Sequence, residues 1–275
     1  MSNLYYRHIG LKPNFGSRFI FMIISNEAEL AGMQEASNAV ALTLKEMSAY
    51  AQPGMSTKEL DEFGGRLLQQ YGAKSAPYET YKFPGYTCIS RNNEVCHGVP
   101  SKDKILREGD LLNIDVSAEL NGFWSDNGGS IIVGQDIHNQ TALVEASRNI
   151  LKKAIYSIKA GSKINDLGGL IEKEAKTQGY RVIKNLGGHG IGRSLHEQPD
   201  GVLNYRDRFD QRRFRKNTVV AVETFISTHS SWAIEGGDEF TLIGDKGGFS
   251  VQHEHTIVVT DGEPIILTAL NGIWD

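Results

Sequence analysis

The spacing of apolar residues predicts two pairs of helices. Positions that recur at helical intervals lie in four segments: 27–51, 56–71, 139–160 and 164–178. Ser56 and Glu59 are spaced as in a capping box, which favours a helix start at that point. Pro53 and Gly54 end the segment before it, and Gly161 separates the last two.

Shorter runs of β-type residues, broken by glycine and asparagine, follow each pair of helices. They cover 86–134 after the first pair and 218–227, 238–243, 250–259 and 263–268 after the second. Because helices and hairpin-type strands come in blocks, we expect an α+β fold with a largely antiparallel sheet. No shift in composition marks a linker, so residues 24–275 are expected to form one domain, preceded by an N-terminal extension over 1–23.

The composition is that of an ordinary globular protein. Of 275 residues, 40% are hydrophobic and 23% are charged, and the formal net charge is −4. A dedicated nucleic-acid binder usually carries a basic stripe, so no specific nucleic-acid partner is expected. The apolar run Phe19–Ile24 is far shorter than the ~18 residues of a membrane span, so we expect a cytoplasmic protein with no membrane partner. Cys88 and Cys96 are expected to be buried, reduced thiols.

A predicted hairpin carries two aspartates. Asn121-Gly122 between two β-type runs indicates a two-residue type I′ turn, which places Asp126 opposite Ser117. Asp115 then lies on the same side, with its α-carbon roughly 7–8 Å from that of Asp126. Both carboxylates are compatible with a solvated face. However, Asp115 has apolar neighbours, and a buried carboxylate needs a cation or an ion pair. Two such side chains are suited to bridging a pair of cations.

Three further residues lie in similarly apolar or glycine-rich surroundings. His189 is flanked by glycines, and Glu223 interrupts a nearly continuous apolar strand. Glu254 lies in the strand predicted over 250–259, on the opposite face from its flanking histidines. Taken singly, each is more often a packed or surface residue. Together with the two aspartates they form a mostly oxygen ligand set with one imidazole, which suits Mn, Fe(II), Co(II) or Zn, and a pair of metals better than one. The sequence lacks a phosphate-binding loop and a serine-hydrolase elbow.

These residues and their neighbours resemble the methionine aminopeptidases. The five candidate ligands occur in the family's order, and three adjoining segments also match: Asn93-Glu94-Val95-Cys96-His97-Gly98-Val99-Pro100, Gly188-His189-Gly190-Ile191-Gly192-Arg193 and Glu254-His255-Thr256-Ile257-Val258. The likeness runs from about Ile24 to Leu267, and no large insertion interrupts its second half, which favours the compact type I form. The resemblance implies the pita-bread fold of creatinase and aminopeptidase relatives, a pseudo-twofold antiparallel sheet covered by helices.

The resemblance also implies a role for each position. Two divalent ions, with Co, Mn, Fe and Zn all compatible, would be held by five ligands: Asp115, Asp126, His189, Glu223 and Glu254. Glu223 would also carry a proton from the attacking water to the leaving amine, His196 would stabilise the oxyanion, and His97 would contact the amide nitrogen of the second substrate residue. The methionine pocket would include four residues: Phe83, Cys88, Leu195 and Phe240.

Some positions depart from the family pattern. Leu195 and Phe240 stand where larger aromatic residues are common, and Phe83 lacks the hydroxyl often found there. A wider, more apolar pocket is expected to relax the preference for methionine, by about 1–3 kcal/mol. The segment Asn127-Gly128-Gly129-Ser130 is expected to loosen the surroundings of Asp126 and to lower the affinity for metal.

The resemblance therefore implies an enzyme that removes the initiator methionine from nascent proteins whose second residue is small. Its partners would be the N-termini of nascent chains, with contact to the ribosome, and it is expected to be a monomer. The alternative enzyme is a proline-specific aminopeptidase or prolidase of the same fold, although such relatives usually carry an extra N-terminal domain. A metal-free module that binds ribosomes or RNA would belong to a different class. Loss of the ligands would mark it, and all five are present.

Overall fold

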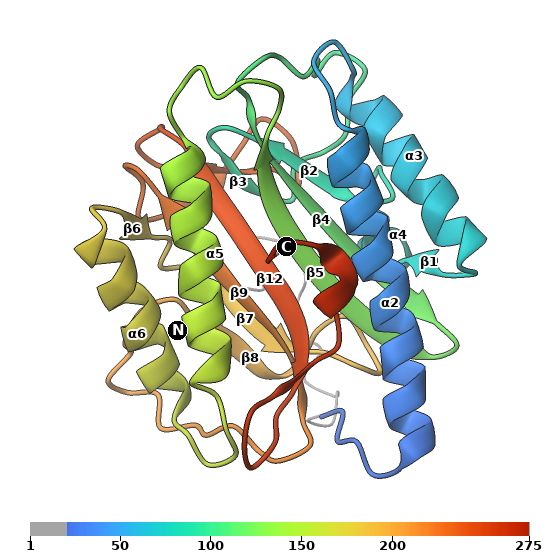
Figure 1. The fold of residues 1–275 in the computed structure, drawn as a ribbon, viewed down its shortest axis with the longest axis vertical. Coiled ribbons are helices and arrows are strands. Elements are labelled where there is room, and N and C mark those ends of the chain that lie inside the picture. Colours follow the sequence, from blue (N-terminus) through green and yellow to red (C-terminus); the bar gives the residue numbers. More distant parts are fainter. Residues whose placement is uncertain (1–20, 275) are drawn as a thin grey trace.

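Two pairs of helices lie over a set of antiparallel sheets (Figure 1). The computed structural model describes residues 21–274, so most of the predicted N-terminal extension, residues 1–20, lies outside the described part. Of the apolar run Phe19–Ile24, the described portion packs onto the body. Met22 is buried, and Ile23 forms a bridge with Thr218.

The four predicted helices are all present, and their ends lie within a few residues of the predicted ones. They are α2 (Glu27–Tyr50), α3 (Thr57–Gln70), α5 (Thr141–Tyr156) and α6 (Ile164–Thr177). The capping box is confirmed, since Ser56 accepts from the backbone of Glu59 and the Glu59 carboxylate accepts from the backbone of Ser56. A further short helix, α4 (Ala76–Tyr81), was not predicted, because six residues are too few to show a helical period.

The first sheet is built around a long hairpin. Its strands are β1 (Lys74–Ser75), β2 (Cys88–Arg91), β4 (Leu111–Leu120) and β5 (Phe123–Ile132). Asn121 and Gly122 both have positive φ, of 52° and 81°, as a type I′ turn requires. The predicted hairpin is therefore confirmed, including its register, because Ser117 pairs with Asp126 without a bulge.

The second sheet contains the longest strands of the C-terminal half. Its members are β6 (Arg181–Val182), β7 (Gly187–Gly190), β8 (Glu197–Leu203), β9 (Val219–Ser227), β12 (Ser250–Val258) and β13 (Ile265–Ile266). Every residue of β9 and β12 is buried. Of the strand predicted over 263–268, only Ile265 and Ile266 pair, and β8 was not predicted at all.

A third, smaller sheet lies beside the first two and corrects one predicted strand. It contains β3 (Glu94–Cys96), β10 (Ala233–Glu235) and β11 (Leu242–Gly244). The prediction of a strand over 238–243 is wrong for its first part. The Asp238 carboxylate there accepts from the backbone of Phe240 and Thr241, so it holds a turn in place of a ladder.

The two halves repeat one arrangement. The helix α2 packs on the hairpin β4–β5, and α5 packs on the pair β9–β12, with β5 and β12 side by side in the middle (Figure 1). A short 3₁₀ segment, η1 (Ala269–Asn271), packs against α2. The largest hydrophobic cluster runs through both halves, which matches the expected α+β fold with pseudo-twofold antiparallel strands covered by helices.

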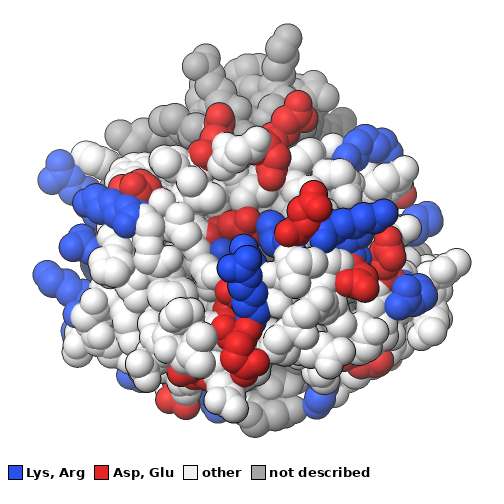
Figure 2. Space-filling view, turned by 90° about the horizontal axis from the view of Figure 1, so that it is seen from above, with Lys and Arg blue, Asp and Glu red and all other residues white. Residues whose placement is uncertain are grey.

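The surface carries charges of both signs. On the face shown in Figure 2, basic and acidic side chains are interspersed. Within residues 21–274, no helix is both long and apolar enough to cross a membrane.

Candidate metal centre and substrate pocket

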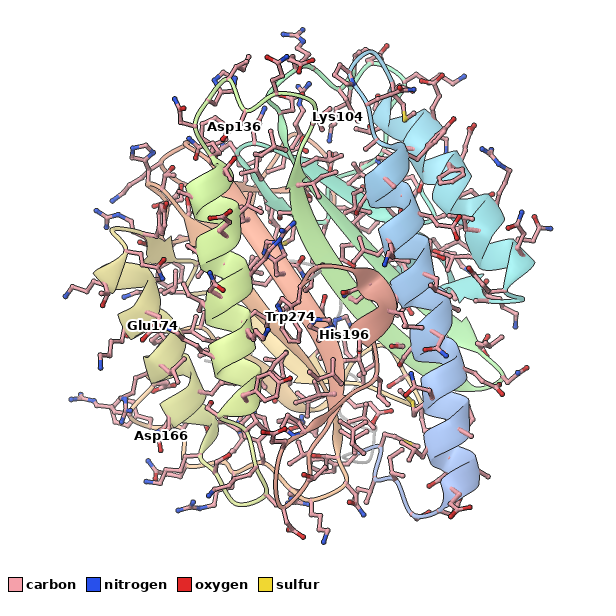
Figure 3. The ribbon with its side chains drawn as sticks, viewed as in Figure 1. Lys104, Asp136, Asp166, Glu174, His196 and Trp274 are labelled. Atoms are coloured by element: carbon pink, nitrogen blue, oxygen red, sulfur yellow. The ribbon has the colours of Figure 1, made fainter. Side chains whose placement is uncertain are left out.

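One pocket collects every candidate residue that the sequence singled out. Its lining includes eleven of them: Phe83, Cys88, His97, Asp115, Asp126, His189, Leu195, His196, Glu223, Phe240 and Glu254. They come from both large sheets and from the loops that connect them. In Figure 3, His196 lies near the centre of the molecule, whereas Lys104, Asp136, Asp166 and Glu174 lie toward its edge.

The two aspartates reach the pocket from the hairpin. Asp115 lies on β4 and Asp126 on β5, and the Ser117–Asp126 pairing places them as diagonal neighbours on one face. Thr256 binds both backbone polar groups of Asp126. Its hydroxyl donates to the Asp126 carbonyl over 2.7 Å and accepts from the Asp126 N–H over 3.2 Å. The hairpin therefore holds the two carboxylates close together.

The two glutamates come from neighbouring strands of the second sheet. Glu223 on β9 pairs directly with Glu254 on β12. Both residues are buried, with 8% and 1% exposure. The strand β9 is otherwise mostly apolar, whereas β12 carries several other buried polar residues. Burial without a partner is costly for a carboxylate, so these positions call for a cation or a hydrogen-bond donor.

His189 is brought to the carboxylates by the glycines around it. A Cβ on Gly188 would overlap the carbonyl oxygen of Ala221, so only glycine lets β7 approach β9 this closely. The His189 Nδ1 lies 3.0 Å from the Gly190 carbonyl, which can only accept, so Nδ1 carries the hydrogen. The lone pair of Nε2 is then free on the side of Asp126, whose Oδ2 lies 3.8 Å away.

The electrostatics of the pocket disfavour four negative charges together. Burial, and then the neighbouring Asp126 carboxylate, raise the pKa of Glu223 to about 8, and burial raises the pKa of Asp126 to about 7. The same two causes raise the pKa of Asp115 and of Glu254 well above the usual range. Burial lowers the pKa of His189 to about 4, so its imidazole is neutral near pH 7.

The donor set fits a divalent metal. Asp126, His189 and Glu254 each offer a ligand atom, and these atoms lie within 4.8 Å of one another. Asp126 Oδ1 and Glu254 Oε1 are buried and have no hydrogen-bond partner among the described residues. Carboxylate oxygens with one neutral imidazole suit Mn, Fe(II), Co(II) or Zn. Asp115 and Glu223 line the same pocket, so further ligands are at hand.

Two more histidines flank this centre. The His196 ring lies 4.3 Å from that of His189, centroid to centroid, and its Nδ1 is 2.5 Å from the hydroxyl of Tyr81. His97 lies in the loop after β3 with a positive φ of 54°. Burial lowers the pKa of His97 to about 4 and that of His196 well below its usual range, so both rings are neutral near pH 7.

The remaining wall of the pocket is apolar. Phe83 and Phe240 meet edge to face, with ring centroids 5.1 Å apart, and Leu195 and the buried thiol Cys88 also line the pocket. Sequence reasoning missed several lining residues: Pro77, Tyr81, Ser117, Asn185, Leu186, Phe225, Ala233, Glu235 and Leu242. Leu186 and Phe225 look like ordinary core residues in the sequence. Ser117, in contrast, lies two positions from Asp115 on the same strand face, so strand periodicity could have identified it.

Comparison with known proteins identifies the family. The sequence profile of metallopeptidase family M24 matches residues 31–261. The chain belongs to this family. One relative, methionine aminopeptidase 2 of Bacillus subtilis, is 48% identical to this chain over 249 residues, which is 90% of this chain and 100% of that protein.

Solved structures agree with this assignment. A methionine aminopeptidase from Thermotoga maritima superposes with a TM-score of 0.84 at 33% identity, covering 90% of this M24 chain and 99% of the other. A prolidase from Pyrococcus horikoshii gives a TM-score of 0.71 at 24% identity, covering 90% and 63%, which supports the fold alone. The pita-bread fold is confirmed, and M24 proteins are metallopeptidases, in keeping with the buried Asp/His/Glu group.

Proposed function

We propose that this chain is a methionine aminopeptidase, which removes the N-terminal methionine from proteins whose second residue is small. The observation that carries this proposal is a single pocket in which a buried Asp/His/Glu group adjoins an apolar recess, lined by Phe83, Cys88, Leu195 and Phe240. The high identity to methionine aminopeptidases over nine tenths of the chain supports it.

The five ligands proposed are Asp115, Asp126, His189, Glu223 and Glu254. Divalent ions held by these residues would supply a water that is nucleophilic near neutral pH and would polarise the scissile carbonyl. Their charge would also compensate carboxylates that are otherwise unfavourable at this depth. The identity of the metal is left open by the ligand set, since Co, Mn, Fe and Zn all accept these donors.

Protein groups then move the proton and hold the substrate. Glu223 takes a proton from the attacking water and delivers it to the leaving amine. His196 donates from Nε2 to the developing oxyanion, in the tautomer for which Tyr81 donates to Nδ1. His97 contacts the amide nitrogen of the second substrate residue. The methionine side chain lies against Phe83, Cys88, Leu195 and Phe240.

We assign the chain to the compact type I form. Between α6 and η1, the described chain contains only strands and loops, with no added helix. We further propose that 24–275 is one catalytic domain with 1–23 as an extension, and that the protein acts as a cytoplasmic monomer on nascent chains near the ribosome.

The direct test is release of free methionine from Met-Ala-Ser by chelator-treated protein reloaded with Mn²⁺ or Co²⁺. Cleavage of Met-Ala-Ser but not of Xaa-Pro peptides is expected. The reverse preference would favour a proline-specific hydrolase, and no cleavage of either would favour a binding module. Glu223→Gln should lower kcat by at least 10²-fold, since general acid–base catalysis contributes about 10²–10⁴-fold. Normal turnover in that variant would refute the proton role.

A further inference from the structure

A buried side-chain amide, that of Gln252, contacts both glutamates. Gln252 is 1% exposed, and its Nε2 lies 2.9 Å from Glu254 Oε2 and 3.3 Å from Glu223 Oε2. One NH₂ group has two hydrogens, so it can serve both carboxylates at once. It binds only one oxygen of each, and Glu254 Oε1 has no hydrogen-bond partner among the described residues. The glutamates are thus held from one side.

The orientation of this amide is set by a neighbour. Asn113 Nδ2 lies 3.3 Å from the Gly129 carbonyl and 3.1 Å from the Gln252 carbonyl, both of which can only accept. The NH₂ end of Asn113 therefore points toward them. It also lies 2.8 Å from Gln252 Oε1, so that end of Gln252 must be the oxygen. Its NH₂ end consequently faces the glutamates.

The room for Gln252 is provided by a glycine. A Cβ on Gly128 would overlap the amide oxygen of Gln252. Ser130, two residues further along β5, locks the backbone of Gln252, accepting from its N–H over 3.1 Å and donating to its carbonyl over 2.9 Å. The side chain cannot move away from Gly128 without giving up buried hydrogen bonds. The unusual segment after Asp126 therefore accommodates Gln252 closely.

We propose that Gln252 is a positioning residue that aligns Glu223 and Glu254 toward a common divalent ion, and that Gly128 is required for this. The inference rests on the proposed metal site. By donating to one oxygen of each carboxylate, Gln252 fixes the two side chains and leaves their other oxygens to the ion. This is the task of hydrogen-bonding partners that lie just outside the ligands of a metal centre.

The test is calorimetric titration of Mn²⁺ into the metal-free full-length chain and two Gln252 variants. Gln252→Met keeps the size but cannot donate, and Gln252→Leu removes both the donor and the acceptor. Both are expected to bind Mn²⁺ about 10–100-fold more weakly than the unmodified chain. If Gln252 only fills space, both variants will bind within about twofold of the unmodified chain, and the inference is wrong.

Two adjacent glycines, Gly128 and Gly129, provide a matched pair of variants in which Gln252 itself is not substituted. Neither has a positive φ, and a Cβ on Gly129 would meet Ile273 and Leu44 but not Gln252. Gly128→Ala is expected to weaken Mn²⁺ binding about tenfold or more, and Gly129→Ala by less than about twofold. Equal effects of the two would overturn the role of Gly128. Circular dichroism confirms that each variant is folded.

A separate outcome concerns the site as a whole. If the unmodified chain takes up no Mn²⁺ and no Co²⁺, the proposed metal site itself fails, and the inference about Gln252 fails with it. If the unmodified chain binds tightly and every Gln252 variant does too, only the inference about Gln252 fails. The two failures are therefore distinguishable in one set of titrations.

Discussion

At the scale of the residue, Tyr81 connects the wall of the pocket to the proposed oxyanion donor. Its hydroxyl lies 2.5 Å from His196 Nδ1. Tyr81→Phe removes this hydrogen bond, worth about 1 kcal/mol, so kcat for Met-Ala-Ser is expected to fall about five- to tenfold with little change in KM. Tyr78→Phe is the matched control, since Tyr78 lies on the same helix but is exposed. Equal kcat values for the two variants would contradict the positioning of His196 by Tyr81.

The size of the recess is also decided by single residues. Leu195 is buried in the pocket wall, at a position where the resemblance leads us to expect a larger aromatic residue. The recess is therefore expected to admit leucine or norleucine as well as methionine. Leu195→Phe should narrow it and raise the preference for methionine about tenfold, within the 1–3 kcal/mol that one missing or added contact of this kind is worth. The measurement is kcat/KM for Met-Ala-Ser against Leu-Ala-Ser. An unchanged ratio would mean that Leu195 does not limit the recess.

At the scale of the element, the β4–β5 hairpin depends on its turn. Gly122 has a φ of 81° and is exposed, so alanine there meets no neighbour but strains the backbone. Gly122→Ala is expected to lower the free energy of unfolding by about 1 kcal/mol, while activity below the unfolding transition is retained. Gly262→Ala is the control, since Gly262 is exposed, has no neighbour within 4 Å and no positive φ. Denaturant unfolding of both variants checks the difference.

The same hairpin shows how much of the site follows from sequence. Asn121-Gly122 determines the turn, the turn determines the register, and the register brings Asp115 and Asp126 to one face. Local rules are sufficient for this step. They are not sufficient for the approach of β5 to β12, which brings Asp126 near Glu254, because that contact joins strands more than a hundred residues apart. There the resemblance to a known family supplied what local spacing could not.

Short elements of secondary structure were also not predicted from the sequence. The strand β8 and the helix α4 were missed because their residues show no regular alternation and their conformation depends on tertiary partners. Gln252 is a different case, since it lies two positions before Glu254 on the same strand and therefore on the same face. That periodicity was available from the sequence. The donor–acceptor chain through Asn113 that gives Gln252 its orientation was not.

At the scale of the whole molecule, the proposed ligands join the two halves. Asp115 and Asp126 belong to the first sheet, whereas His189, Glu223 and Glu254 belong to the second. A bound ion would therefore both neutralise buried carboxylates and cross-link the sheets. Because it binds the folded chain only, Mn²⁺ at 100 times its dissociation constant should stabilise that chain by about 2.7 kcal/mol. For a chain of this size, that corresponds to a rise in Tm of roughly 5–10 °C.

Thermal unfolding with a chelator and with excess Mn²⁺ measures this rise. Asp126→Asn is the decisive variant, since Asp126 Oδ1 is buried without a hydrogen-bond partner among the described residues and its Oδ2 faces His189. The variant should lose most of the rise in Tm, and its metal-free form should be no less stable than the unmodified metal-free chain, because one buried charge has been removed. Asp166→Asn, at an exposed salt bridge far from the pocket, should retain the full rise. A rise that survives in Asp126→Asn would place the stabilising ion elsewhere, and the two sheets would then owe their association to packing alone.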